Sequence, residues 1–351
     1  MERSLPVDVE AVVTLCVASG TLKVRGWDKN EVRVRSLDAT QIDFRRIDKT
    51  KDTSKPASRV DVMVLNKETS TNPRIDCQAI ADVEMEVPSG ATVQVQTRDG
   101  DIAIAGVAGA YAGSQNGDIT IERATKLVEA GSVGGSILLK DSSGRVNLSS
   151  AGGGVEVMNV RASTDEDTFE VGTVSGDIQL ERVSNAKVTA KTVNGTVTMS
   201  GPLAKSGSYG FTNMAGDIVL AMPHDASFQL NAKVSEKHDI VSDFALKYLS
   251  DATPPPPPPG VLKPKSPEMK SKSPEMKSKS PEDKSKAPTK VTPAPKPMPA
   301  PKAGPVIAPI TVEKSSMPGH YVLRRVTAIC GSGDATISIA SFGGTVRLKK
   351  I

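Results

Sequence analysis

A glycine-centred phrase that recurs between Thr92 and Met222 constrains the fold of this chain more than any other feature. Each copy joins a turn ending in glycine to a short run of alternating apolar residues, as in Asn-Gly-Asp-Ile-Thr-Ile at residues 116–121. The aligned glycines are Gly100, Gly117, Gly135, Gly154, Gly176, Gly195 and Gly216, with Gly344 in a further copy near the C-terminus. Their spacings in the central stretch are 17, 18, 19, 22, 19 and 21 residues. A period of about 20 residues, built from strand and turn residues, is typical of a stacked β architecture.

Each repeat contains two predicted strands, one before and one after the glycine turn, because apolar and polar residues alternate on both sides of it. Equivalent strands of successive repeats can pair about 4.8 Å apart. The sequence therefore predicts an all-β protein, a β-solenoid or β-helix-like stack of repeats of about 20 residues. Stacking would align the two apolar residues of each repeat with those of the next repeat, in columns inside the fold. The pairs, one for each repeat, are Ile102 and Ile104, Ile119 and Ile121, Ile178 and Leu180, Val197 and Met199, and Ile218 and Leu220.

A second architecture is compatible with the same turns. Asn-Gly between alternating runs is also the strongest short signal for an antiparallel hairpin. A twisted antiparallel β-sandwich built from such hairpins is therefore the alternative, although the steady period favours the solenoid.

Residues 1–91 contain predicted strands without the glycine period, and we expect an antiparallel N-terminal β portion there. The segments 21–25 and 31–35 alternate apolar and basic residues around a polar connection that contains glycine and tryptophan. This pattern predicts a hairpin with one buried and one solvent-facing side. The repeats follow in residues 92–250, which we interpret as the solenoid proper.

Residues 251–305 differ from the rest of the chain in composition. They contain an unbroken proline run at residues 254–259 and three copies of a Ser-Pro-Glu heptapeptide between residues 266 and 286. Proline removes backbone donors, and Lys, Ser and Glu offer little apolar surface to bury, so we expect a disordered Pro/Lys/Ser-rich insertion. The strand pattern resumes in residues 306–351, which predicts a C-terminal coil that completes the solenoid and covers an exposed strand edge.

The net charge of +4 is unevenly distributed. Between residues 260 and 302 there are eleven lysines and four acidic residues, so the remainder of the chain is slightly acidic. The β repeats are therefore not expected to bind nucleic acid, which favours basic faces with interleaved aromatic residues. We expect the lysines of the insertion to belong to a solvated spacer, and weak contact with an anionic surface is the alternative interpretation.

The three cysteines, Cys16, Cys77 and Cys330, lie far apart in strand-like segments. Free cysteine behaves as a small apolar residue, so we expect buried thiols. One disulfide with a leftover thiol is the alternative, with the pair left open. No transmembrane helix is expected, because no apolar run approaches 18 residues. Residues 1–6 lack the plan of a signal peptide, which is compatible with a cytoplasmic protein or with a leader that has been removed.

Several phrases resemble the putative-adhesin family of β-strand-repeat proteins, whose members carry a domain of unassigned function. The likeness rests on Leu-Pro-Val at residues 5–7, on residues 19–28, on the serial Gly-Asp-Ile phrases and on Gly-Gly-Thr-Val at residues 343–346. It covers residues 5–250 and 320–351. The resemblance implies a bacterial protein that is exported or held at the cell envelope, and it supplies no catalytic residues.

Four aspartates follow their glycines at equivalent repeat positions: Asp101, Asp118, Asp177 and Asp217. Stacked on one edge, they are weak candidates for a calcium ladder. Other residue types interrupt the column, however, and aspartate commonly caps turns by accepting hydrogen bonds from nearby backbone N–H groups. We therefore expect turn capping, no metal site and no cofactor. The histidines lie outside any recognisable catalytic motif, and the glycine-rich stretches open no helix that could cradle a phosphate.

These observations favour a non-enzymatic β-repeat protein of the cell envelope that acts as an adhesion, interaction or structural module. Its expected partner is an unidentified protein or envelope polymer. A self-assembling scaffold, similar to cytoskeletal β-helix proteins, is the first alternative, and a β-helix enzyme acting on polysaccharides is the second.

Overall fold

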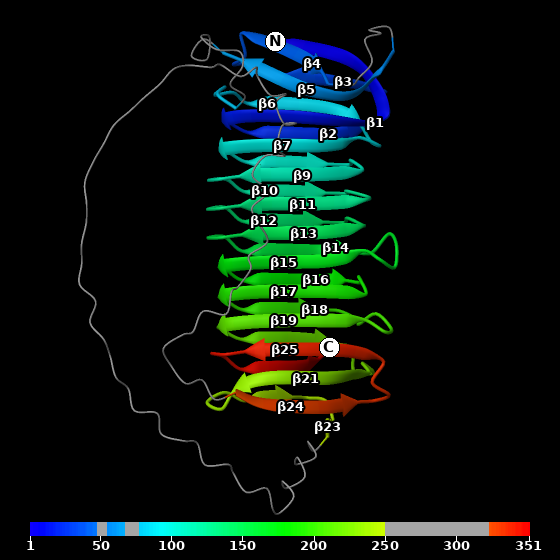
Figure 1. Cartoon of the computed structure of the whole chain (residues 1–351), viewed down its shortest axis with the longest axis vertical. Helices are drawn as coiled ribbons and strands as arrows, with labels where there is room; N and C mark the ends of the chain where they lie inside the picture. The colour runs from blue at the N-terminus through cyan, green and yellow to red at the C-terminus, as the bar shows by residue number, and fades with distance from the viewer. Residues whose placement is uncertain (48–54, 67–76, 250–322) are drawn as a thin grey trace, which may run out of the picture. The chain divides into compact units, whose positions relative to one another are not determined.

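The computed structural model describes residues 1–47, 55–66, 77–249 and 323–351. The chain divides into two compact units, residues 1–250 with 305–351 and residues 251–304. The second unit, which contains most of the predicted disordered insertion, lies outside the described residues. In the described part of the first unit every helix or strand element is a strand, and the strands are numbered β1 to β26 along the chain (Figure 1).

The strands form two sheets that face each other across the core. Sheet B runs, in the order of its hydrogen-bonded neighbours, through β4 (Gln41–Arg46), β5 (Ala57–Leu65), β1 (Glu2–Ser19), β7 (Thr92–Asp99), β9 (Gly109–Ser114), β11 (Leu127–Ser132), β13 (Arg145–Ser150), β15 (Thr168–Ser175), β17 (Lys187–Asn194), β19 (Ser208–Ala215), β25 (Ala335–Ser341), β21 (Phe228–Ser235), β24 (Leu323–Cys330) and β23 (Lys247–Tyr248).

Sheet A supplies the second strand of each coil. Its order is β1, β3 (Glu31–Arg35), β6 (Val83–Pro88), β2 (Leu22–Trp27), β8 (Ile102–Ala105), β10 (Ile119–Glu122), β12 (Ile137–Lys140), β14 (Val155–Val160), β16 (Ile178–Val183), β18 (Val197–Ser200), β20 (Ile218–Met222), β26 (Val346–Lys350) and β22 (Ile240–Ser242). The long strand β1 contributes to both sheets.

Equivalent strands of successive coils pair in parallel and in register. Ile119 of β10, for example, lies opposite Ile102 of β8 and Ile137 of β12. The two strands that flank a glycine turn belong to different sheets. The turn therefore connects sheet B to sheet A and does not close a hairpin between paired strands. The predicted β-solenoid-like stack is therefore confirmed, and the alternative sandwich of antiparallel hairpins is wrong.

The core is a set of stacked apolar columns between the two sheets. Each of the expected pairs on sheet A, from Ile102 and Ile104 to Ile218 and Leu220, is buried. Sheet B contributes an opposing set that includes Phe169, Tyr209 and Phe211. Because each buried aliphatic or aromatic side chain contributes about 1.5–3 kcal/mol by leaving water, these columns are the main favourable term for stacking coil on coil.

Two coils are inserted out of sequence order, one near each end of the stack. The coil β1/β2 lies between β5/β6 and β7/β8. The coil β25/β26 lies between β19/β20 and β21/β22. The C-terminal coil is therefore an internal member of the stack, whereas the expectation placed it on an exposed edge; the neighbouring strand β24 covers the edge of β21 instead.

The predicted hairpin between residues 21–25 and 31–35 is wrong. These segments form β2 and β3, but β6 lies between them and pairs with both, in parallel with β2 and antiparallel with β3. Other antiparallel pairs of the N-terminal portion are β1 with β3 and β4 with β5. The hairpin prediction failed because the alternation of apolar and basic residues shows which face of each strand is buried and does not show which strand is its neighbour.

Candidate functional site

A ladder of glycines runs along the turns that connect sheet B to sheet A. A Cβ atom built on Gly117 would lie 2.0 Å from the carbonyl oxygen of Gly100, and one on Gly135 would lie 2.1 Å from that of Gly117. Real Cβ atoms do not approach backbone this closely, so the coils can stack only if this position lacks a side chain. The members of the ladder are Gly20, Gly100, Gly117, Gly135, Gly153, Gly176, Gly195, Gly216 and Gly344.

The alignment expected from the sequence is wrong at one of these positions. Gly153, and not Gly154, stands against the carbonyl oxygen of Gly135, and the Cβ position of Gly176 in turn meets the carbonyl oxygen of Gly153. Two consecutive glycines made the choice ambiguous in the sequence. Gly20 was not recognised, because its turn precedes the periodic region.

A row of buried polar side chains accompanies the ladder, three residues before each glycine from Gly100 onward. The Ser132 hydroxyl donates to the carbonyl oxygen of Gly117 at 3.1 Å, and the Ser150 hydroxyl donates to that of Gly135 at 2.9 Å. The same bond to the preceding coil is made by Ser114, Thr173, Thr192 and Asn213. Sequence reasoning missed this row, although a Ser, Thr or Asn three residues before each glycine of the periodic region was a visible signal that would also have identified Gly153.

The four aspartates that follow the turns bond to backbone of the next coil. Asp118 Oδ1 accepts the N–H of Ser136 at 2.7 Å, and Asp177 Oδ1 accepts that of Thr196 at 2.7 Å. Asp101 and Asp217 accept the N–H groups of Asp118 and Thr345. In the described ranges no three His, Cys, Asp or Glu side chains come together in a group that could hold a metal ion.

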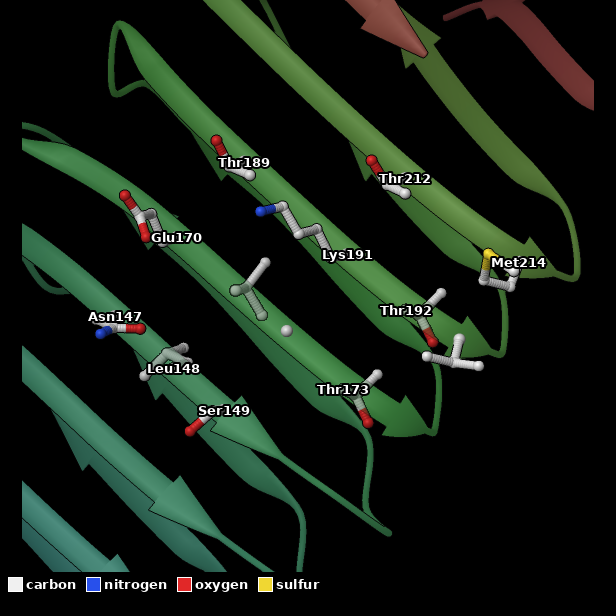
Figure 2. Close-up of a pocket in the computed structure, with 13 residues that line it drawn as sticks. Asn147, Leu148, Ser149, Glu170, Thr173, Thr189, Lys191, Thr192, Thr212 and Met214 are labelled. Atoms are coloured by element: carbon white, nitrogen blue, oxygen red, sulfur yellow. The ribbon is translucent and has the colours of Figure 1, made fainter. Parts of the chain in front are cut away.

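The outer face of sheet B contains a shallow trough over β13, β15, β17 and β19, with a volume of about 80 Å³ (Figure 2). Strand register places Ser149, Gly172, Lys191 and Thr212 in one row across it, with Asn147, Glu170 and Thr189 in the next row. Gly172 forms the floor, because it has no side chain, and the nearest atom to a Cβ built there is the Lys191 carbonyl oxygen at 3.8 Å.

The polar side chains of the trough are available to a ligand. No hydrogen bond or ion pair joins Asn147, Ser149, Thr189 or Thr212 to another described side chain or backbone group through its side chain. Glu170 and Lys191 add one charge of each sign. The trough therefore offers hydroxyl, amide, carboxylate and ammonium groups that can hydrogen-bond a polar molecule lying across several coils.

A larger hollow of about 470 Å³ lies on the outer face of sheet A over β2, β8 and β10. Two alanines of β8, Ala103 and Ala105, form its floor between longer side chains of the neighbouring strands. Most of its charged groups already have partners: Arg123 pairs with Glu122, and Lys23 pairs with Glu84. This hollow therefore offers fewer free polar groups than the trough.

Carboxylates near the N-terminal end of the stack have perturbed acidities. The hydrogen bond from Arg35 holds the pKa of Glu2 below its usual range. Hydrogen bonds from Asn116 and then Arg98 lower the pKa of Asp99 in the same way. Glu2 is exposed and Asp99 is half-buried, and each carboxylate accepts a hydrogen bond from a side chain of a neighbouring strand or turn.

Cys16 and Cys77 form a disulfide with their Cα atoms 4.7 Å apart. The expectation of free thiols is therefore wrong for these two residues, which the out-of-order coil brings together. Cys330 is free and buried, and burial raises the pKa of its thiol.

Within the described ranges the chain forms no helix with the length and apolarity that a membrane crossing requires. No curated protein matches the chain. The crystal structure of a "putative cell adhesion protein" from Clostridium sporogenes ATCC 15579 is similar at 8% sequence identity, over 100% of this chain and 99% of that chain, with a TM-score of 0.19. A TM-score this low supports no inference about function.

The Toastrack DUF4097 family model matches residues 19–248, in agreement with the resemblance expected from the glycine phrases. The match includes the N-terminal coils as well as the periodic region. Because it spans more than half of the 351 residues, the chain belongs to the Toastrack DUF4097 family, a domain family of unassigned function, and is a β-repeat module.

Proposed function

We propose that this protein is a non-enzymatic interaction module of the cell envelope that binds an extended, hydroxyl-rich envelope polymer on the outer face of sheet B. The observation that carries the proposal is the trough, where unpartnered hydroxyl and amide side chains lie in register across four adjacent coils. Rows of this kind recur about every 4.8 Å. They suit a linear polymer that makes many weak contacts, and binding then gains from multivalency.

The disulfide supports an exported location. Disulfides form and persist outside the reducing cytosol. The pair Cys16–Cys77 links two coils in the N-terminal part of the stack. An extracytoplasmic protein would keep this bond, and a cytosolic one would lose it.

The covered strand edges favour a module over the self-assembling scaffold. In sheet B the edge of β5 is paired with antiparallel β4, and that of β21 with antiparallel β24. Open end-to-end stacking would need free parallel edges, so antiparallel covers oppose it. Sedimentation and electron microscopy separate the two: filaments would support the scaffold.

The trough can be tested by filling it without disturbing the fold. Gly172→Arg places a long side chain on the floor, where a Cβ meets nothing closer than 3.8 Å. Gly113→Arg is the matched control, because Gly113 lies on the same face of sheet B outside the trough and its Cβ position is 3.7 Å from Gln96.

We expect Gly172→Arg to reduce co-sedimentation with purified insoluble envelope polysaccharide by about tenfold, equivalent to about 1.4 kcal/mol. Gly113→Arg should leave it unchanged. If the two variants bind equally well, the trough is not the contact surface, and if the unmodified protein does not sediment with the polymer, the polymer class is wrong.

A further inference from the structure

The C-terminal coil occupies a slot between two coils that are consecutive in the chain. β25 pairs in parallel with β19 on one side and with β21 on the other, and β26 pairs with β20 and β22. The strands that bound the slot therefore come from residues 208–242, whereas its occupant comes from beyond residue 322. Figure 1 shows β25 seated between β19 and β21.

The slot needs an occupant. On its two sides, β19/β20 and β21/β22 each present backbone donors and acceptors that pair only with the C-terminal coil. The coil also fills the core there, since Ile337, Ile339, Val346 and Leu348 are all buried. An empty slot would leave four unpaired strand edges, two in each sheet, and an apolar gap between them.

The connection to the C-terminal coil is far longer than insertion requires. The chain leaves the described region at Leu249, whose N–H bonds to the carbonyl oxygen of Thr327, and β23 pairs antiparallel with β24. The end of β23 and the strand β24 thus lie side by side, and a loop of about 2–5 residues would be enough to join two such strands. Residues 250–322 contain 73 residues instead. A chain of that length can span at most about 250 Å, enough to reach another molecule.

We propose that the slot accepts β25 and β26 (Ala335–Lys350) of a second copy of this chain, with β24 of that copy on the far edge of β21, so that two molecules exchange their C-terminal coils. The foreign coil makes the same backbone pairs and the same core contacts as the molecule's own coil. The balance between the two is therefore set by concentration and by the tether. Reciprocal exchange satisfies both slots and closes a dimer, which distinguishes it from open filament growth.

A cysteine pair across the slot reports whose coil fills it. Thr212 of β19 and Ala340 of β25 are register partners on the outer face of sheet B. Two full-length variants are made, and both carry Cys330→Ala. The first also carries Thr212→Cys and one affinity tag, and the second carries Ala340→Cys and a different tag. The two are mixed, unfolded with the native disulfide intact, refolded together and oxidised.

Tethers hold their ends at an effective concentration on the order of 1 mM, so at about 0.1 mM protein we expect about one slot in ten to contain a foreign coil. In an equimolar mixture about a quarter of these slots bring an Ala340→Cys coil into a Thr212→Cys chain and appear as mixed disulfides between the two tags, and their fraction rises with concentration. Thr212→Cys mixed with Thr336→Cys is the matched control, because Thr336 pairs with Ser208 and lies four residues from the Thr212 partner.

The single chain that carries both Thr212→Cys and Ala340→Cys should close an internal disulfide. Mixed disulfides no more abundant in the matched pair than in the mismatched pair, at every concentration, would overturn the proposal. Failure of the double variant to close internally would overturn it as well, since the coil would then not occupy the slot. Cross-linked species of the double variant that are larger than a dimer would contradict reciprocal exchange.

Discussion

At the scale of single residues, the contacts between turns decide whether coils can stack. Each ladder glycine from Gly100 onward lies against the carbonyl oxygen of the preceding ladder glycine, and a Ser, Thr or Asn side chain usually donates to that same oxygen. Aspartates add a further bond to the next coil. These bonds are each worth about 1 kcal/mol net, but they recur in coil after coil and fix the register between them.

Replacing a ladder glycine should destabilise the stack sharply. Gly135→Ala would place a methyl group 2.1 Å from the Gly117 carbonyl oxygen, so neighbouring backbone must shift. We expect a loss of about 2–3 kcal/mol in the free energy of unfolding. Urea unfolding followed by circular dichroism measures it. Gly113→Ala, with 3.7 Å of room, serves as the control and should change stability by less than about 0.5 kcal/mol.

The lowered pKa of Asp99 predicts a pH-dependent contribution to stability. Because the folded pKa lies below the ordinary value of 3.8, the contribution is complete above that value and is lost as pH falls through the folded pKa. Asn116→Ala removes the principal hydrogen bond, so its destabilising effect should be present at neutral pH and smaller near pH 2. Melting temperatures at the two pH values test this. An equal effect at both would mean that the bond does not depend on the Asp99 charge.

At the scale of elements, β1 organises the N-terminal end of the stack. Its 18 residues pair with β3 in sheet A and with β5 and β7 in sheet B. The disulfide ties Cys16 of this strand to Cys77, just before β6, so the inserted N-terminal coil is covalently held to its neighbour. The inserted C-terminal coil has no such link among the described residues.

Removing the disulfide should weaken the N-terminal end. The bond joins residues with a sequence separation of 61, and a disulfide typically stabilises the folded protein by about 2–4 kcal/mol. We expect Cys16→Ser with Cys77→Ser, or added reductant, to lower stability by that amount. Cys330→Ala should respond to reductant as the unmodified protein does. If the effect of reductant disappears in Cys330→Ala, then it depends on Cys330 and the prediction for the Cys16–Cys77 disulfide is wrong.

At the scale of the whole molecule, the described stack is a one-dimensional array in which each coil contacts only its neighbours. Stability in such arrays is a sum of coil terms and interface terms, so different parts can open separately. The coils from β9 to β18 are joined by short turns. The C-terminal coil is joined through 73 residues, and closing a longer loop costs more conformational entropy.

Hydrogen exchange should therefore be graded along the stack. We expect backbone amides of β25 and β26 to exchange faster than equivalent amides of β11 to β14, and β21 to become exposed together with β25. Native-state exchange followed by mass spectrometry measures the protection of each strand. Uniform protection from β11 to β26 would show that the molecule opens only as a single unit, and would contradict the separate opening of the C-terminal coil.

The sequence by itself determined the class of the fold and the composition of its core. Strand alternation and glycine turns are local properties that each coil repeats, so the β stack, the family and the buried columns from Ile102 to Leu220 could all be predicted. The trough could not, because Gly172 and its neighbours form a surface only after four coils are in register. The coil β21/β22 was also hard to anticipate, since it lacks the glycine phrase.

Only the tertiary structure decided which coil lies beside which. Parallel pairing offers similar bonds to any equivalent strand, so sequence neighbours have no strong advantage over distant ones. The order therefore depends on which arrangement pairs all the strands and buries all the apolar columns together. In that arrangement β6 lies between β2 and β3, and the C-terminal coil lies between two earlier coils. The Cys16–Cys77 bond follows from that order, because residues 61 positions apart meet only once β1/β2 lies between β5/β6 and β7/β8.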